Sequence, residues 1–307
     1  MPGCALAPIG WGMTKSGGVR DLYDRRFYGA EEEADFAEGA GSNETPQTLH
    51  PAYRLAFRDE DFLLLPELRP VRFQLELLKP EMLLDQAGVG STLVMYGSAR
   101  IPSQEEVEAR REAAAGKSEA EQKVAERLIE KAKYYQEAYN LARMVTEKAI
   151  IEDGERQFVI TTGGGPSIME AGNRGASDAG GESIGLNIVL PHEQAPNTFV
   201  TPYLSFQFHY FALRKMHFLL RAKAVAVFPG GFGTFDEFFE LLTLVQTGKM
   251  KPMPILLFGK DFWNRVIDFE ALAEEGTISH RDLDLITWCE TADEAWAAIA
   301  KFYELKG

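Results

Sequence analysis

The stretch Ala224-Val-Ala-Val-Phe-Pro-Gly-Gly-Phe-Gly-Thr-Phe-Asp-Glu237 decides the fold of this chain. Its first five residues are apolar and have the length and composition of a buried β-strand. A Pro-Gly-Gly turn ends the strand, and the pattern after it predicts a helix over about residues 235–248. A continuous apolar strand that leads through a glycine-rich turn into a helix is typical of a parallel sheet covered on both faces.

The same pattern occurs twice earlier in the chain. Thr92-Leu-Val-Met-Tyr96 leads into Gly97-Ser98, and Phe158-Val-Ile-Thr-Thr162 leads into Gly163-Gly-Gly165. Shorter apolar runs predict further strands at residues 183–190, 254–258 and 285–289. Together these segments predict an α/β fold over residues 88–307, a doubly wound, Rossmann-like parallel sheet with helices on both faces.

Three other segments differ from this pattern. Residues 1–48 are acidic with few aliphatic side chains, and we expect a loosely ordered arm. Residues 49–87 are expected to be a helical extension that packs on the core, because apolar residues follow helical spacing between Pro66 and Gln86 at Val71, Leu75, Leu78, Met82 and Leu83. Residues 103–133 are rich in charge and alanine, which predicts an inserted helix or helical hairpin that projects into solvent or contacts another subunit.

The charge balance argues against several partners. The 307 residues contain 32 Lys plus Arg and 46 Asp plus Glu, a formal net charge of −14. Nucleic-acid-binding and membrane-surface proteins usually present a basic surface, so we expect neither partner. The chain shows no secretory signal pattern and no apolar run of membrane-spanning length, so a cytoplasmic location is expected. Its two cysteines, Cys4 and Cys289, give neither a disulfide framework nor a zinc pattern.

The glycine-rich strand ends are the places where a ligand is expected. In an open parallel sheet ligands bind beyond the carboxyl ends of the strands, and a helix N-terminus there favours an anion such as a phosphate. The alternative is a plain turn, since Thr234 and Glu237 also match a Thr-x-x-Glu capping box. The dinucleotide pattern GxGxxG fails at Gly163-Gly-Gly165, and the nucleotide pattern GxxxxGK[ST] fails at Gly116-Lys-Ser118, where Arg111 stands in place of the first glycine, which together favour a nucleoside monophosphate.

A local lack of acidic residues supports the same location. Residues 194–235 contain no Asp or Glu, although the composition predicts about six, and they do contain Arg214, Lys215, Arg221 and Lys223. Arg214 and Lys215 are candidates to bind an anion, and the alternative is that they pair with surface carboxylates.

Among the acidic residues, Glu237 is the candidate catalytic carboxylate, expected in the first turn of the helix after the loop. Asp236 would point roughly 100° away from it, and Glu170 is expected to be structural. No metal site is expected, because His209 and His217 lie about 12 Å apart along a helix.

Three segments in order resemble the LOG (Lonely Guy) family over about residues 90–303. They are Gly163-Gly-Gly-Pro-Ser-Ile-Met-Glu-Ala-Gly-Asn-Arg-Gly-Ala176, Arg214-Lys215, and Pro229-Gly-Gly-Phe-Gly-Thr-Phe-Asp-Glu237. Members of that family are nucleoside 5′-monophosphate phosphoribohydrolases that act on AMP or on cytokinin riboside monophosphates, and some have carried a lysine decarboxylase label. The chain departs from the family pattern with Phe218 in place of a methionine, with the insertion and with the extension. It resembles the longer branch, for which AMP is the expected substrate.

The resemblance implies a role for each matching position. Arg214 and Glu237 would be the catalytic side chains. The substrate would be bound by residues from all the glycine-rich loops and by the lysine beside the arginine, namely Gly97, Ser98, Gly164, Gly165, Met169, Lys215, Pro229, Gly230, Gly231, Gly233 and Thr234. The family also implies a homodimer or a larger homo-oligomer, with no cofactor.

The expected reaction is hydrolysis of the N-glycosidic bond of AMP to adenine and ribose 5-phosphate. Its transition state resembles an oxocarbenium ion, which a carboxylate near C1′ stabilises. One alternative is a non-catalytic nucleotide or cofactor carrier of the same fold, such as the molybdenum-cofactor carriers. DNA-processing proteins with this fold are disfavoured by the net acidity. A lysine decarboxylase would need a lysine that forms a Schiff base with pyridoxal phosphate, and no lysine here has a persuasive context.

Overall fold

The computed structural model describes residues 28–40, 44–191 and 195–305 of the chain. By its internal contacts the chain divides into two compact units, Met1–Leu75 and Glu76–Gly307. The second unit contains every strand of the described chain and all the glycine-rich turns discussed above.

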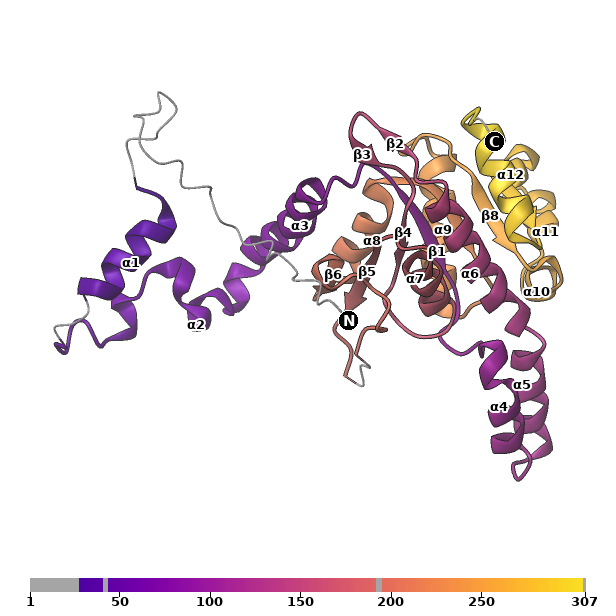
Figure 1. Ribbon diagram of the computed structural model, residues 1–307, viewed down its shortest axis with the longest axis horizontal. Helices are drawn as coiled ribbons and strands as arrows, with labels where there is room; N and C mark the ends of the chain where they lie inside the picture. Colours follow the sequence, from indigo (N-terminus) through magenta and orange to yellow (C-terminus); the bar gives the residue numbers. More distant parts are fainter. Residues whose placement is uncertain (1–27, 41–43, 192–194, 306–307) are drawn as a thin grey trace. The chain divides into compact units, whose positions relative to one another are not determined.

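The second unit is built on one seven-stranded sheet in which every neighbouring pair of strands is parallel (Figure 1). The strand order is β6-β5-β4-β1-β7-β8-β9, so the sheet grows outward in both directions from β1. This is the doubly wound, Rossmann-like α/β fold that the sequence predicts. The strands are β1 Thr92–Tyr96, β4 Val159–Thr162, β5 Ser183–Ile188, β6 Ser205–Phe208, β7 Ala222–Val227, β8 Ile255–Phe258 and β9 Ile286–Cys289.

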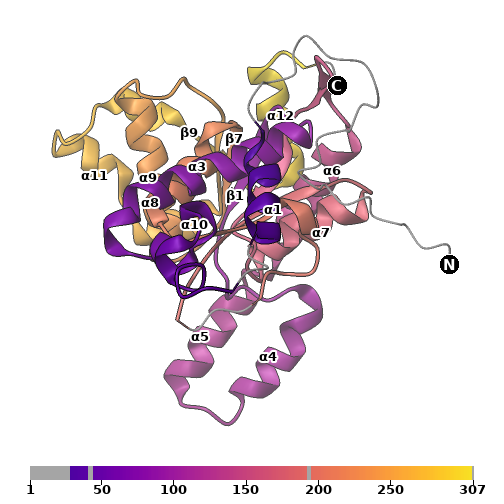
Figure 2. The ribbon, with the colours of Figure 1, turned by 90° about the vertical axis from the view of Figure 1, so that its left-hand side faces the viewer.

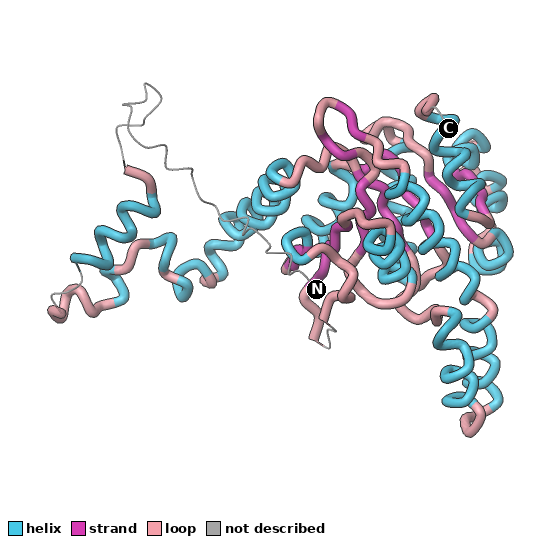
Figure 3. Tube along the Cα trace, in the orientation of Figure 1, coloured by secondary structure: helices cyan, strands magenta, loops and turns pink. Residues whose placement is uncertain are grey.

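Helices cover both faces of the sheet because alternate side chains of each strand point to opposite sides. On one face, Leu93 and Met95 of β1 belong to a core shared with helices α6, α7 and α12. On the other face, Val94 and Tyr96 belong to a core shared with α3, α8 and α9 (Figures 1 and 3). The helices of this unit are α6 Ala132–Glu147, α7 Ile168–Asp178, α8 Phe211–Leu220, α9 Phe232–Gln246, α10 Lys260–Val266, α11 Phe269–Glu274 and α12 Ala292–Phe302.

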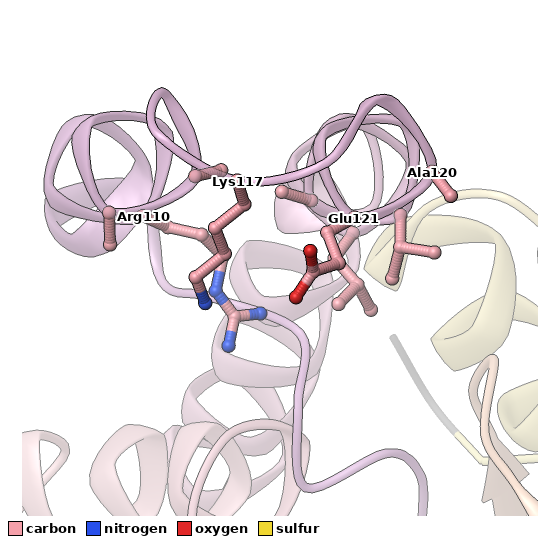
Figure 4. A pocket seen from close by; sticks show the side chains of 9 residues that line it. Arg110, Lys117, Ala120 and Glu121 are labelled. Atoms are coloured by element: carbon pink, nitrogen blue, oxygen red, sulfur yellow. The ribbon is translucent and has the colours of Figure 1, made fainter.

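The insertion after β1 is a helical hairpin that projects away from the sheet (Figures 1 and 2). It consists of α4 Val107–Ala114 and α5 Glu119–Ile129, preceded by the 3-10 turn Gln104–Glu106. Ser118 and Glu121 form a capping box at the start of α5, which satisfies backbone N–H groups at that end. A mainly apolar groove between the two helices is lined by alanines and Val124, with Arg110, Lys117 and Glu121 at its edge (Figure 4).

The remaining helices, strands and 3-10 turns of the described residues lie outside the central sheet and its covering helices, apart from α3. They are α1 Ala30–Ala40, α2 Glu60–Leu63, α3 Arg69–Gln86, the antiparallel pair β2 Ile151–Glu152 and β3 Glu155–Arg156, and 3-10 turns at Pro51–Tyr53, Ala56–Arg58, Pro66–Leu68, Pro202–Leu204 and His280–Leu285. No helix in the described ranges is long and apolar enough to cross a lipid bilayer.

Two N-terminal segments were expected from the sequence. Of the arm expected over residues 1–48, residues 1–27 and 41–43 lie outside the described residues, and Glu31, Glu32 and Glu33 lie in the first turn of α1, where acidic side chains interact favourably with the helix dipole. Helix α3 forms between Pro66 and Gln86 as the spacing predicts. Its apolar residues Leu78 and Met82 are nevertheless exposed, and Leu84 is buried in the core.

Candidate functional site

Three glycine-rich loops meet at the carboxyl edge of the central strands. Strands β4, β1 and β7 are adjacent in the sheet, so the loops that follow them start side by side. The N–H of Ser98 donates to the carbonyl oxygen of Pro229 at 3.1 Å, and the N–H of Ile168 donates to the carbonyl oxygen of Ser98 at 3.4 Å. Main-chain hydrogen bonds therefore tie the three loops into one surface.

Helix α9 begins earlier than the sequence predicts. Its first residue is Phe232 and its N-cap is Gly231, with no side-chain capping bond. Thr234 is therefore inside the helix, and the interpretation of Thr234 and Glu237 as a capping box is wrong. Glu237 lies in the second turn of α9, not in the first, because the helix starts three residues before the expected position.

Two glycines of this loop face different surroundings. A Cβ atom on Gly230 would lie 2.1 Å from the Thr234 hydroxyl oxygen, so the Thr234 side chain already fills that space. A Cβ atom on Gly231 or Gly233 would meet nothing within 4 Å. The N–H groups at the start of a helix have no acceptor within the helix. The start of α9 therefore combines unfilled space with backbone donors.

The turn after β4 is shaped by the side chains around it. Gly164 has φ +72°, and a Cβ there would lie 2.2 Å from the amide oxygen of Asn187. A Cβ on Gly163 would lie 2.5 Å from Nη2 of Arg214, and one on Gly165 would lie 2.7 Å from Cε of Met169. The backbone of this turn therefore lies directly against Arg214, Met169 and Asn187.

A buried polar network that the sequence analysis missed holds this turn. The Asn197 amide nitrogen donates to the carbonyl oxygens of Gly164 at 3.1 Å and Gly165 at 3.0 Å, and to Oδ1 of Asn173 at 2.9 Å. Thr162 donates its hydroxyl proton to the same Asn173 oxygen at 2.7 Å. The sequence signal was weak, because single asparagines between strands are common in loops of many kinds.

The centre of the surface is an ion pair between Arg214 of α8 and Glu237 of α9. Arg214 Nη1 lies 3.2 Å from Glu237 Oε1, and the side chains are only 10% and 13% exposed. Arg214 also donates from Nε to the carbonyl oxygen of Leu186 at 2.6 Å, and its guanidinium lies 5.0 Å from the centre of the Phe218 ring. The structure thus brings together the two side chains proposed as catalytic, and Phe218 supports the arginine through a cation–π contact.

Burial changes the acidity of this site. Burial raises the pKa of Glu237 to about 7, although the neighbouring Arg214 lowers it; Asp236 raises it and Lys215 lowers it. Tyr96, at the end of β1, also has a raised pKa, first because it is buried and second because of the Glu237 charge. A carboxyl group with a pKa near neutrality can both give and accept a proton at physiological pH, which is the usual requirement for acid–base chemistry.

The acid-free segment does not produce a free basic surface. Lys215 Nζ lies 3.1 Å from both Asp236 and Glu240 of α9, and Arg221 pairs with Glu81 and Asp85 of α3. The pairing alternative holds for these cations, because the fold places carboxylates from distant segments beside them. A count of acidic residues along the sequence could not detect this pairing with distant carboxylates.

Other candidate residues have structural contacts. Glu170, in the first turn of α7, accepts a hydrogen bond from the Tyr135 hydroxyl at 3.0 Å. His217 is buried and its pKa is lowered, mainly by burial. Within the described residues, no group of three His, Cys, Asp or Glu side chains is arranged to hold a metal ion.

Comparison with known proteins finds relatives of this part of the chain. Residues 169–299 match a family model described as "Possible lysine decarboxylase". Over 136 residues the chain is 28% identical to cytokinin riboside 5′-monophosphate phosphoribohydrolase LOG3 of Arabidopsis thaliana. The Rossmann-like unit of this chain is therefore similar to LOG-family proteins. The alignment covers 43% of this chain and 61% of the Arabidopsis protein, so the chain spans less than two thirds of this relative.

Two solved structures are also similar to this chain. A structural-genomics X-ray structure titled TM1055 aligns over 69% of this chain and 99% of its own, with 18% identity and a TM-score of 0.43. The molybdenum-cofactor carrier protein of Chlamydomonas reinhardtii aligns over 70% of this chain and 98% of its own, with 18% identity and a TM-score of 0.40.

Lys215, the lysine beside Arg214, does not fit pyridoxal phosphate chemistry. A lysine that forms a Schiff base needs a lowered pKa so that its amine is neutral. Burial lowers the pKa of Lys215, but hydrogen bonds from its ammonium to Glu240 and Asp236 outweigh that effect, and the pKa is raised. The family description as a decarboxylase therefore finds no support at this position.

Proposed function

We propose that this chain hydrolyses the N-glycosidic bond of a nucleoside 5′-monophosphate, with AMP as the first candidate, to a free base and ribose 5-phosphate. One observation carries the proposal: the buried Arg214–Glu237 pair lies on the helix pair α8 and α9, within two turns of the open N-terminus of α9. The Arabidopsis relative, named as a phosphoribohydrolase of cytokinin riboside 5′-monophosphate, supports the same class of reaction.

The start of α9 is the proposed phosphate site. The backbone N–H groups of Phe232, Gly233 and Thr234 lie in the first turn, where a helix leaves its donors unpaired and carries a partial positive charge. The space beside Gly231 and Gly233 lets an anion approach this backbone. Binding energy from the phosphate would hold the ribose in place for the reaction at C1′.

Glu237 is the proposed reacting carboxylate. In the reaction the C1′–N bond breaks, a water molecule adds its hydroxyl to C1′ and gives up one proton, and the departing base takes up one proton from solvent. The Glu237 carboxylate would accept a proton from that water and stabilise the positive charge that develops on the sugar. Its pKa of about 7 keeps a substantial fraction of the carboxylate ionised at neutral pH.

The test measures base release from a panel of nucleoside monophosphates by the purified full chain. AMP should yield free adenine. Glu237→Gln should reduce turnover at least about 100-fold while AMP still binds, because general acid–base contributions are of that order and the phosphate contacts remain. Arg214→Ala should weaken both turnover and binding.

Asp236→Asn is the matched control, because it neutralises the adjacent carboxyl group on the same helix while Lys215 keeps Glu240. It should retain most of the activity. AMP binding without any base release in the wild-type protein would replace the hydrolase with a nucleotide-binding carrier. Unchanged turnover in Glu237→Gln would remove Glu237 from the mechanism.

The proposal also covers the partners, the location and the assembly state of the enzyme. The substrate is a small phosphorylated molecule, and neither nucleic acid nor a membrane is a partner of a chain with a net charge of −14. The enzyme would act in the cytoplasm as a homodimer or larger homo-oligomer, with no cofactor. Light scattering of the purified chain would measure its assembly state.

A further inference from the structure

Helix α8, which carries Arg214, is held at its start by helix α3. The carboxylate of Glu76 accepts hydrogen bonds from the N–H of His209 at 3.0 Å and the N–H of Tyr210 at 3.3 Å. Tyr210 is the N-cap of α8, and its own side chain makes no capping bond. A negative charge at this end of a helix is also favoured by the helix dipole. Glu76 therefore supplies from α3 a contact that the local sequence of α8 lacks.

The same helix holds the far end of α8. Nε2 of His217 lies 3.1 Å from the carbonyl oxygen of Glu76, and the His217 side chain is 1% exposed. Arg221, the residue after the last turn, lies 2.9 Å from Glu81 and 2.6 Å from Asp85. It also donates to the carbonyl oxygen of Val89 at 2.5 Å. Contacts of α3 therefore flank Arg214 on both sides along α8.

Arg214 lies between these two anchor points. A helix of ten residues moves largely as one body, so a change at either end displaces the guanidinium. The Arg214–Glu237 distance of 3.2 Å depends on that placement, because Glu237 is carried by a different helix. Charged contacts of this kind are directional, and truncating one partner costs more than losing a surface ion pair.

We propose that residues 76–85 of the N-terminal extension are a positioning element of the site, which holds α8 so that Arg214 stays paired with Glu237. The expected effect on catalysis rests on the proposed function. The placement of Arg214 beside Glu237 by residues 76–85 does not depend on it. It gives the extension a role that the sequence did not suggest, since the extension contributes no side chain to the Arg214–Glu237 pair itself.

The proposal predicts an effect on acidity as well as on rate. Glu237 is faced by Arg214 and Lys215 from α8, by Asp236 from its own helix and by Tyr96 from β1. When α8 shifts, the cations move away from Glu237 and the pKa of Glu237 rises. A role in general stability alone would lower the amount of folded protein and leave that pKa unchanged.

The experiment compares the full chain with Glu76→Ala and Arg221→Leu. In each protein the pKa of Glu237 is read from the carbon NMR shift of its labelled carboxyl group, and the rate of adenine release from AMP is measured against pH. Each variant should raise the pKa of Glu237 by about half a unit or more, because the opposite charge of Arg214 at this distance lowers a carboxyl pKa by roughly one to three units. Arg221→Lys should restore much of the wild-type midpoint, since it keeps a cation beside Glu81 and Asp85.

Glu182→Ala is the matched control. Glu182, just before β5, is a half-buried carboxylate that also has two partners, Arg156 and the Tyr203 hydroxyl. Neither partner belongs to α8. Its removal should lower the melting temperature without moving the Glu237 midpoint. An unchanged Glu237 titration midpoint in both Glu76→Ala and Arg221→Leu would overturn the positioning role. An equal shift in the Glu182→Ala control would overturn it as well.

The two proposals fail in different ways. If the wild-type protein releases no base, the proposed hydrolase is wrong, yet the NMR titration still decides whether α3 controls Glu237. If base is released and the NMR midpoint does not move in Glu76→Ala or Arg221→Leu, the enzyme stands and the positioning role is wrong. If one variant does not fold, the other variant decides.

Discussion

Neighbouring glycines before α9 are required for different reasons. Gly230 has no room for a side chain, because Thr234 folds over its Cα, whereas Gly231 faces open space and has an extended backbone with φ −103°. Alanine can adopt that backbone conformation. The first glycine therefore serves the packing of the loop, and the second is free to serve a ligand.

Replacing these two glycines separates folding from binding. Gly230→Ala should destabilise the protein by about 1–3 kcal/mol, the usual cost of forcing an extra group into a packed site. Gly231→Ala should melt like the wild type but bind AMP at least about tenfold more weakly, because a methyl group would occupy the approach to the backbone donors. Thermal unfolding and calorimetric titration with AMP measure the two effects. Wild-type AMP affinity in Gly231→Ala would show that the phosphate binds elsewhere.

At the residue scale the sequence identified the two paired side chains but not the contacts around them. Arg214 and Glu237 were identified from the motif, and the structure pairs them. The asparagine network was missed, because the partners of Asn197 lie 24 to 33 positions away and no local pattern connects them. Side chains that act by contacting distant backbone become visible only when the fold is known.

Most strands were predicted from short apolar runs. Strands β1, β4 and β8 are fully buried runs of apolar residues and Thr, β7 is buried over its last four residues, and the sequence located each of them. Strand β6 was not predicted, because Ser205 and Gln207 alternate with Phe206 and Phe208 at the edge of the sheet. Four residues of alternating pattern are too short to distinguish from a loop.

The turn between β4 and α7 depends on a loop from another part of the sheet. Asn197→Ala would leave the carbonyl oxygens of Gly164 and Gly165 and the amide oxygen of Asn173 without this donor. The Gly164 oxygen keeps the backbone N–H of residue 197 and the Asn173 oxygen keeps the Thr162 hydroxyl, so the Gly165 oxygen is the acceptor that loses its donor. We expect a loss of about 1–3 kcal/mol in the free energy of unfolding, because removing the donor from an acceptor inside the fold is costly. Denaturant unfolding measures the loss. Asn140→Ala, on the surface of α6, is the control and should change stability by less than about 0.5 kcal/mol; equal effects would contradict the role of the network.

Over the whole molecule, the acidic balance and the site are connected through pairing. Lys215 and Arg221 of the acid-free segment are compensated by carboxylates from α9 and α3, which the fold brings beside them. Net charge therefore indicates which large polyanions are disfavoured as partners, but not where a small anion binds. In the described unit the unusual electrostatic feature is a buried carboxyl group, not an excess of positive charge.

That buried carboxyl group makes folding stability depend on pH in a defined direction. The folded protein binds a proton on Glu237 with a pKa of about 7, compared with the ordinary value of 4.5. Between these two values the folded state holds a proton that the unfolded state has lost. Stability therefore falls as the pH rises from about 4.5 to about 7, and it no longer depends on this group above that range.

Comparing the wild-type protein with Glu237→Gln isolates this contribution, since the other titrating groups largely cancel. The stability of the wild type relative to the variant should fall by about 3 kcal/mol as the pH rises from 4.5 to 7.5, because each pKa unit corresponds to about 1.4 kcal/mol. Denaturant unfolding at several pH values in this range measures the difference. A difference that stays constant with pH would mean that Glu237 titrates normally in the folded protein, and a difference that rises would mean that Arg214 lowers its pKa more than burial raises it.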